Sequence, residues 1–287
     1  MSEQHPAPAR AFGAVADAYE RGRPSYPVEA AAWLAGATPL SVLELGAGTG
    51  KLTRSLVELG HDVHATDPDP AMLAVLSHEL PGVRTSVSSA EEIPAGDRSY
   101  DVVVAAQAFH WFDHARALPE IARVLKPGGL LSLVWNQRDT RIPWVRRLGN
   151  VIGQTGDQGS GRPDLADDGP EPLVVSGLFG FVEDATFRSW QTVTRDTIAD
   201  LALSRSHVAM LDEPGRAEVA ARTVRFYDDY GRGMDGMQLP YLVRCFRARV
   251  VDLPEPEGLQ IERRRPHDPA IEPPTDGDSG LLLIDFR

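Results

Sequence analysis

Cysteine and long apolar runs are nearly absent from this sequence. Cys245 is the only cysteine among 287 residues, which excludes a disulfide framework and a thiolate metal site, and we expect no metal. No apolar stretch approaches the roughly 20 residues that span a bilayer. Residues 1–10 are polar and lack the apolar centre of a signal peptide. We therefore expect a soluble, cytoplasmic protein without a membrane partner.

Positive charge is also scarce. The chain has 29 Lys and Arg against 41 Asp and Glu, for a formal net charge of −12 and an isoelectric point near 5.1. A nucleic-acid surface needs a basic face, so we expect no nucleic-acid partner. The length suffices for one large domain with additions or for two small domains.

The chain is organised around a strand, a glycine turn and a helix. Residues 41–45 form a short apolar run, which predicts a buried strand. Gly46, Gly48 and Gly50 follow, and the leucines of residues 51–59 then fall on one helical face. Without a Cβ at these positions, a ligand can lie against backbone N–H groups, so the turn predicts a binding site.

The spacing of the turn narrows the ligand. It reads G-x-G-x-G rather than the dinucleotide pattern G-x-G-x-x-G, and Lys51 is followed by Leu52 rather than by the Ser or Thr of a phosphate loop. A second predicted strand, residues 62–66, ends at Asp67, where a carboxylate can accept hydrogen bonds from both ribose hydroxyls. We infer a cofactor that contains a nucleoside. A nicotinamide-dependent oxidoreductase is a weaker alternative because the turn lacks the dinucleotide spacing.

Strands and helices alternate through the first half of the chain. Predicted strands at 62–66, 83–87, 100–105 and 130–135 are separated by helices of ordinary length, which indicates a doubly wound, mostly parallel α/β sheet. A long strand candidate at 181–194 and a last one at 239–251 predict an antiparallel hairpin on the sheet's edge. The helical stretches between them, 197–204 and 215–230, could cover the ligand crevice.

These patterns divide the chain into three regions. Residues 1–38 are expected to form N-terminal lid or cap helices, and residues 39–252 the cofactor-binding domain with cap helices near 196–236. Residues 253–287 are rich in proline and charge, which favours a mobile tail.

Three further groups of residues each allow two interpretations of their role. The helix predicted from residue 12 onward is either a packing helix or a lid whose Tyr19, Arg23 and Tyr26 face the ligand. Arg138 and Arg141, after the fifth strand, either hold an acidic small substrate or lie on a solvated helix face. His110 follows the fourth strand and is either a general base or a structural histidine.

Several motifs together resemble a known family. Residues 42–50, Asp67, residues 100–103 and residues 123–129 resemble, in order, the motifs of class I S-adenosylmethionine-dependent methyltransferases. The segments 108–112 and 12–27 resemble its small-molecule branch, which includes trans-aconitate methyltransferase-like proteins. The resemblance implies a seven-stranded Rossmann-like sheet with N-terminal lid helices and a helical insertion before the last strand. It also implies S-adenosylmethionine as cofactor and S-adenosylhomocysteine as product.

The same resemblance assigns roles to cofactor-binding residues. Asp67 would bind the ribose hydroxyls and Glu44 the amino group, while the Gln107 carbonyl would meet the ammonium. Trp111 or Tyr19 could stabilise the sulfonium. The remaining assignments are Gly46 and Gly48 to the methionine part, and Pro68, Met72, Ala90 and Glu91 to the adenine. Ala47, between the two glycines, is also expected to bind the cofactor. Ser89 departs from the family pattern, which often has an acid there, so Glu91 is the substitute for the adenine N6 contact.

The predicted reaction is in-line methyl transfer to an oxygen or nitrogen of a small metabolite, with an acidic metabolite as one hypothesis. A carboxylate acceptor needs no general base, whereas a phenol or amine usually does, and His110 is the candidate. A catalytically silent cofactor-binding or regulatory protein is the alternative, because a cofactor pocket does not prove turnover.

Overall fold

The structure is a computed structural model of the chain, and it describes residues 16–153, 169–230 and 236–251. The start of the predicted lid, residues 12–15, and the predicted tail, residues 253–287, lie outside the described residues. The boundaries of the three predicted regions stay a prediction.

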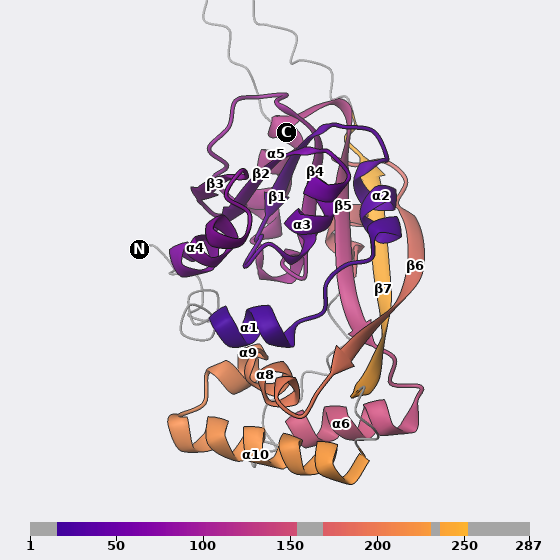
Figure 1. The fold of residues 1–287 in the computed structure, drawn as a ribbon. Helices are drawn as coiled ribbons and strands as arrows, with labels where there is room; N and C mark the ends of the chain where they lie inside the picture. Colours follow the sequence, from indigo (N-terminus) through magenta and orange to yellow (C-terminus); the bar gives the residue numbers. More distant parts are fainter. Residues whose placement is uncertain (1–15, 154–168, 231–235, 252–287) are drawn as a thin grey trace, which may run out of the picture. The chain divides into compact units, whose positions relative to one another are not determined.

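The described residues form one seven-stranded sheet with the order β3-β2-β1-β4-β5-β7-β6 (Figure 1). Strands β1 to β5 pair in parallel, whereas β7 is antiparallel to both β5 and β6. The strands are β1 (Ser41–Leu45), β2 (Asp62–Asp67), β3 (Arg84–Val87), β4 (Tyr100–Ala106), β5 (Leu125–Arg138), β6 (Glu183–Val193) and β7 (Met237–Arg249). The predicted doubly wound, mostly parallel sheet with an antiparallel edge hairpin is therefore confirmed.

Helices cover both faces of this sheet because neighbouring residues of each buried strand point to opposite sides. Val42 of β1 packs in one core with α2 and α3, and the next residue, Leu43, packs in another core with α5. The helices are α1 (Ala16–Gly22), α2 (Val28–Ala35), α3 (Lys51–Glu58), α4 (Pro70–Glu79), α5 (His114–Val124), α6 (Pro143–Gly153), α7 (Glu171–Val175), α8 (Thr197–Leu203), α9 (Ser206–Ala209) and α10 (Glu213–Tyr230), with a 3-10 turn, η3 (Phe109–Trp111).

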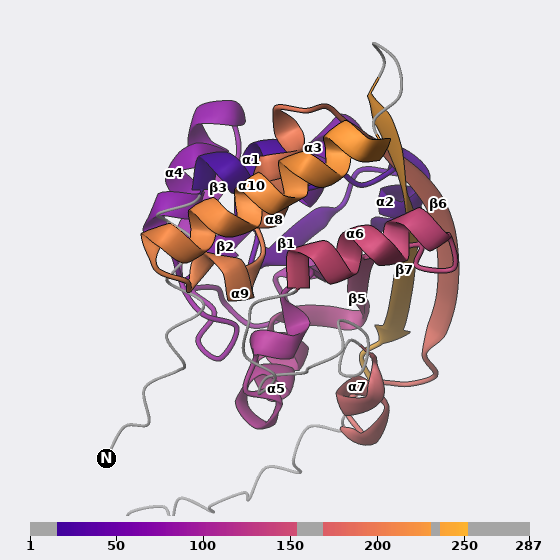
Figure 2. The ribbon, with the colours of Figure 1, turned by 90° about the horizontal axis from the view of Figure 1, so that it is seen from below.

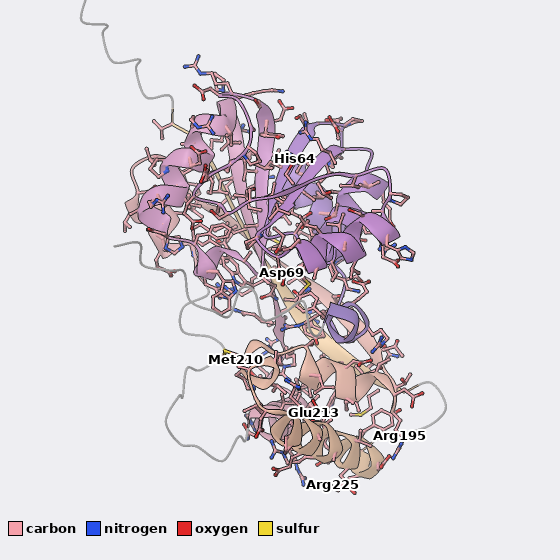
Figure 3. All side chains as sticks on the ribbon, turned by 90° about the vertical axis from the view of Figure 1, so that its left-hand side faces the viewer. His64, Asp69, Arg195, Met210, Glu213 and Arg225 are labelled. Carbon is pink, nitrogen blue, oxygen red and sulfur yellow. The ribbon has the colours of Figure 1, made fainter. Side chains whose placement is uncertain are left out.

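A separate apolar core holds α6 together with the helical insertion between β6 and β7, and we call α6, α8, α9 and α10 the cap. Val145 and Leu148 of α6 pack there with Ile198 of α8, Phe226 of α10 and Leu239 of β7. Figure 2 shows the cap helices gathered together and seen from below. Figure 3 shows Met210, Glu213 and Arg225 with the cap, while His64 and Asp69 lie with the sheet. None of the described helices combines the length and apolar character needed to cross a bilayer.

Helix α1 joins the cap to the glycine turn. Arg21 pairs with Asp200 of α8 through two bonds, from Nε to Oδ2 at 2.8 Å and from Nη2 to Oδ1 at 3.1 Å. A Cβ on Gly22 would lie 2.4 Å from the Asp200 carbonyl carbon, so α1 sits directly on the backbone of α8. On its other side, Glu20 accepts from Nζ of Lys51, the first residue of α3, at 2.7 Å. The structure thus brings the cap close to the turn that follows β1.

Candidate active site

The glycine turn has the backbone conformation that its sequence predicts. Gly46, Gly48 and Gly50 have φ values of 67°, 57° and 87°, in the left-handed region that side chains disfavour. A Cβ on Gly46 would lie 2.5 Å from the Cβ of Ala108, so close packing also requires glycine there. The Ala47 N–H donates to the carbonyl of Thr66 at 2.9 Å, which holds the turn against β2.

Asp67 lies at the end of β2 and faces the turn. Its Oδ2 accepts from the Gly48 N–H at 2.9 Å and its Oδ1 from the Asp69 N–H at 2.8 Å. Burial raises the pKa of Asp67 to about 6, although both backbone hydrogen bonds lower it. Each carboxylate oxygen can accept more than one hydrogen bond, so the group still has acceptor capacity for ligand hydroxyls.

Glu44 is a buried acid with unused hydrogen-bonding capacity. It is 1% exposed, and its Oε2 accepts from the Thr53 hydroxyl at 2.6 Å. Its Oε1 is enclosed and finds no hydrogen-bond partner among the described residues, and the same is true of Oγ1 of Thr49. Burial raises the pKa of the Glu44 carboxyl to about 8, against the lowering effect of the Thr53 bond. Enclosed polar atoms of this kind are rare in native proteins and fit a site that takes a polar ligand.

The residues expected around the adenine lie near the ends of β2 and β3. Met72, Ala90 and Glu91 are buried, and Pro68 follows Asp67 directly. Oε1 of Glu91 accepts from the Asp113 N–H at 2.8 Å, so one oxygen of this carboxyl already supports the start of α5. The adenine contacts of these four residues remain predictions.

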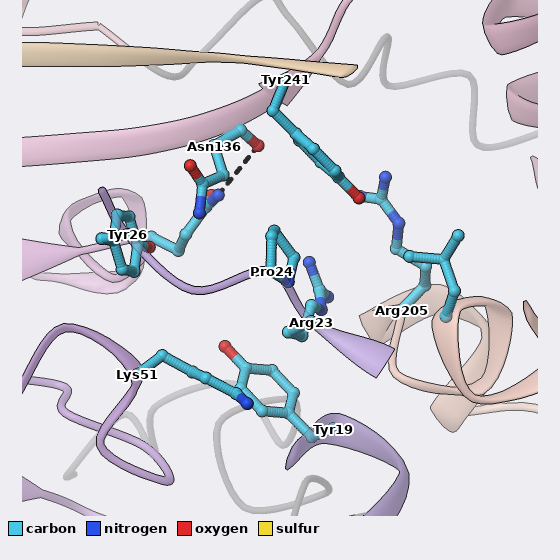
Figure 4. A pocket seen from close by; sticks show the side chains of 10 residues that line it. Tyr19, Arg23, Pro24, Tyr26, Lys51, Asn136, Arg205 and Tyr241 are labelled. Carbon is cyan, nitrogen blue, oxygen red and sulfur yellow. Dashed lines mark hydrogen bonds between the residues drawn. The ribbon is translucent and has the colours of Figure 1, made fainter. Parts of the chain in front are cut away.

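A pocket opens beside the glycine turn, between α1, the sheet and the cap (Figure 4). Its volume, including the open mouth, is about 400 Å³. Four residues singled out from the sequence line it: Tyr19, Arg23, Tyr26 and Gln107. The other six were not predicted from the sequence to line a pocket; they are Pro24, Lys51, Asn136, Leu201, Arg205 and Tyr241.

Polar contacts fix several of these lining residues. The Gln107 amide donates to the Asn136 carbonyl at 3.0 Å, and Gln107 has a φ of 56°, which places its backbone in the left-handed region after β4. Oδ1 of Asn136 is enclosed without a hydrogen-bond partner in the described part of the chain. Arg23 donates from Nη2 to the Ser204 carbonyl at 2.7 Å, and its guanidinium lies 5.1 Å from the Tyr19 ring centre.

Four other candidates from the sequence lie elsewhere. Arg141 is exposed, pairs with Asp139 through two bonds of 2.7 Å and is not among the described lining residues. Arg138, at the end of β5, is not among the described lining residues, although its charge acts on Tyr241. His110 and Trp111 form η3 with ring centres 4.9 Å apart, also outside that lining. Their predicted roles in catalysis and binding stay untested.

Comparison with known proteins identifies the family. A model described as a methyltransferase domain matches residues 43–133. An uncharacterized methyltransferase from Mycobacterium tuberculosis is 46% identical over 241 residues, which cover 83% of this chain and 95% of that protein. This chain belongs to the methyltransferase family. The family and the sheet are those of class I S-adenosylmethionine-dependent methyltransferases, whereas membership in the trans-aconitate methyltransferase-like branch remains a prediction.

Solved structures support this methyltransferase fold. A candidate type II methyltransferase from Anaeromyxobacter dehalogenans matches with a TM-score of 0.52 at 22% identity, over 79% of this chain and 97% of that one. A candidate methyltransferase from an antibiotic biosynthesis pathway of Anabaena variabilis matches with a TM-score of 0.53 at 18% identity, over 77% and 95%. At these identities the similarity establishes the fold alone.

Proposed function

We propose that this methyltransferase transfers the methyl group of S-adenosylmethionine to an oxygen or nitrogen of a small metabolite. The observation that supports the proposal is that two features of the structure lie next to each other. A left-handed glycine turn faces Asp67, and a lined pocket opens directly beside that turn. The family gives no support to a nicotinamide-dependent oxidoreductase. The experiments below distinguish an active methyltransferase from a catalytically silent protein.

The chain's own residues fit this cofactor. Oε1 of Glu44 is an enclosed acceptor without a described partner, which suits an ammonium group, and Asp67 retains acceptor capacity for ribose hydroxyls. A Cβ built on Gly48 would point into open space, because its nearest neighbour is an atom of Tyr19, 3.9 Å away. A ligand can therefore approach the backbone at Gly48 in a way that it cannot at Gly46.

When bound, S-adenosylmethionine supplies a methyl group on a cationic sulfonium, whose C–S bond breaks with its electron pair left on sulfur. The protein's main task is to hold the acceptor in line and exclude water, and such positioning can contribute about 7–11 kcal/mol. Helix α1 and the cap enclose the pocket for this purpose, and Arg21, Asp200 and Arg23 fix α1 to α8.

Cofactor binding and turnover test the proposal together. Calorimetry should detect S-adenosylhomocysteine and S-adenosylmethionine but not NAD, and a labelled methyl group should appear in a product of a small-metabolite pool. Binding without any methylated product would favour the silent protein. Failure to bind S-adenosylhomocysteine would remove the proposed function altogether.

Asp67→Ala should weaken S-adenosylhomocysteine binding by about 1.5–3 kcal/mol, the contribution of hydrogen bonds to a charged acceptor. The measurement is the dissociation constant by calorimetry at pH 7.5, where Asp67 is ionised. Asp62→Asn is the matched control, because Asp62 begins the same strand at its opposite, exposed end. Equal affinities for the Ala variant and the wild type would contradict the role of Asp67.

Cofactor binding at pH 7 should also release a proton from Glu44. Its carboxyl is mostly protonated there because burial raises its pKa to about 8, and a neighbouring ammonium favours the ionised form. Calorimetric enthalpies measured in buffers of different ionisation enthalpy report the number of protons released. Glu44→Gln should remove this dependence, and an unchanged dependence would assign the proton to another group.

A further inference from the structure

The pocket beside the glycine turn carries an excess of positive charge. Arg23, Lys51 and Arg205 line it, whereas no Asp or Glu is among its described lining residues. Glu20 offsets Lys51 through the 2.7 Å bond between them. Arg23 and Arg205 add two further cationic side chains to this lining, in a chain whose overall charge is −12. Such a local reversal of sign favours a negatively charged ligand.

Among the described residues, the guanidinium of Arg23 has no hydrogen bond to an anionic group. Nη2 donates to a neutral carbonyl, that of Ser204, and Nε is enclosed without a hydrogen-bond partner among the described residues. Burial lowers the pKa of Arg23, and the nearby charge of Arg205 lowers it further. Two guanidiniums held close together are stabilised by an anion placed between or beside them.

Arg205 marks the end of the pocket that belongs to the cap. It lies between α8 and α9, and Figure 4 shows the Tyr241 hydroxyl of β7 directed toward it. Tyr19 and Lys51 lie together at the other end, next to the glycine turn. A cofactor held by the turn would lie at the Tyr19 and Lys51 end, which would leave the Arg205 end for the methyl acceptor.

The chemistry of the lining also favours an acceptor that is already nucleophilic. The described lining contains no His, Asp or Glu that could remove a proton. Burial raises the pKa of Tyr26 and of Tyr241, which keeps both hydroxyls protonated at neutral pH. A carboxylate or phosphate oxygen needs no base before it attacks.

We propose that the cap end of this pocket, through Arg205, binds the anionic group of a small carboxylate or phosphate methyl acceptor. The proposal rests on the proposed function, because the cofactor's position at the glycine turn defines which end remains for the acceptor. It assigns acceptor selection to the helical insertion rather than to Arg138, the last residue of β5, or to Arg141.

The test titrates benzoate, phenyl phosphate and benzamide into the complex with S-adenosylhomocysteine. These probes share one ring and differ in the charged group. We expect one or both anions to bind and benzamide not to bind, and the anion that binds more tightly identifies carboxylate or phosphate as the preferred group. Arg205→Gln should weaken anion binding by about ten- to hundredfold, as expected for a lost charge-assisted hydrogen bond, and leave S-adenosylhomocysteine affinity unchanged.

Two further variants make the result decisive. Arg225→Gln carries the same charge change on the exposed face of α10 and should bind the anions like the wild type. Arg205→Lys keeps the charge and should retain part of the anion affinity. If the Gln variant fails to fold, the anion affinity of the Lys variant tests the proposal. Equal binding of benzamide and the anions, no anion binding, or an anion affinity insensitive to both Arg205 variants would overturn the proposal. Loss of S-adenosylhomocysteine binding by the wild type would instead overturn the proposed function.

Discussion

The free energy of unfolding of the unliganded protein should fall as the pH rises from about 5 to about 8. Glu44 is the cause: burial raises its pKa to about 8, far above its ordinary value. Over this range the native state keeps a proton that the unfolded chain has already released, so stability decreases with pH, by at most about 1.4 kcal/mol per pH unit for one group. Asp67, with its pKa raised to about 6, adds to the decrease between pH 4 and 6.

Denaturant unfolding at a series of pH values measures this slope. Glu44→Gln should flatten it between pH 6 and 8, because the amide cannot ionise and its oxygen can still accept from the Thr53 hydroxyl. Glu58→Gln is the matched control, since Glu58 is an exposed glutamate at the end of α3. A slope that Glu44→Gln leaves unchanged would show that another group controls the pH dependence.

The sheet was predictable because its pattern is local. Strands such as β1 and β4 are short apolar runs that end in turn residues, and helices such as α3 and α5 have one apolar face, so the layer structure follows from general rules. The start of β5 was predicted at Leu130, but the strand begins at Leu125. Lys126 to Gly129 looks like a turn, and the structure accommodates these residues within the strand by a register shift between Tyr100 and Val102.

The candidate site was predictable only where it is formed by the ends of adjacent parallel strands. Gly46, Gly48 and Asp67 belong to adjacent strand ends, whose meeting follows from the parallel order of β1 and β2. Asn136 near the end of β5 could have been found by the same rule. Arg205 could not, because its position depends on how the cap packs.

For Arg141 and Tyr241 as well, the sequence pattern could not predict whether the side chain lines the pocket. Arg141 follows β5, near the expected crevice, but forms an ion pair with Asp139 only two residues away. Tyr241 reaches the pocket because the antiparallel register of β7 places it opposite Arg138. Neither a local ion pair nor a long-range register can be read from hydrophobic periodicity.

Gly46→Ala should destabilise the protein by about 2–5 kcal/mol. Two costs add: about 1–2 kcal/mol for a side chain in the left-handed conformation, and about 1–3 kcal/mol for overpacking. The second cost arises because the new Cβ would lie 2.5 Å from the Cβ of Ala108, and both residues lie just beyond the paired ends of β1 and β4. Denaturant unfolding of the unliganded protein measures the loss.

Gly48→Ala and a double variant separate the two costs. Gly48 has a φ of 57°, yet its Cβ would meet nothing closer than Tyr19 at 3.9 Å, so only the conformational cost of about 1–2 kcal/mol should appear. Combining Gly46→Ala with Ala108→Gly removes the contacting methyl group, and the pair should show a coupling energy of about 1–3 kcal/mol. If Gly46→Ala proves no less stable than Gly48→Ala, contact between the turn and the end of β4 does not constrain this position. If the coupling appears, the contact with Ala108 explains why Gly46 is required for close packing. Gly48, in contrast, leaves the backbone accessible to a ligand.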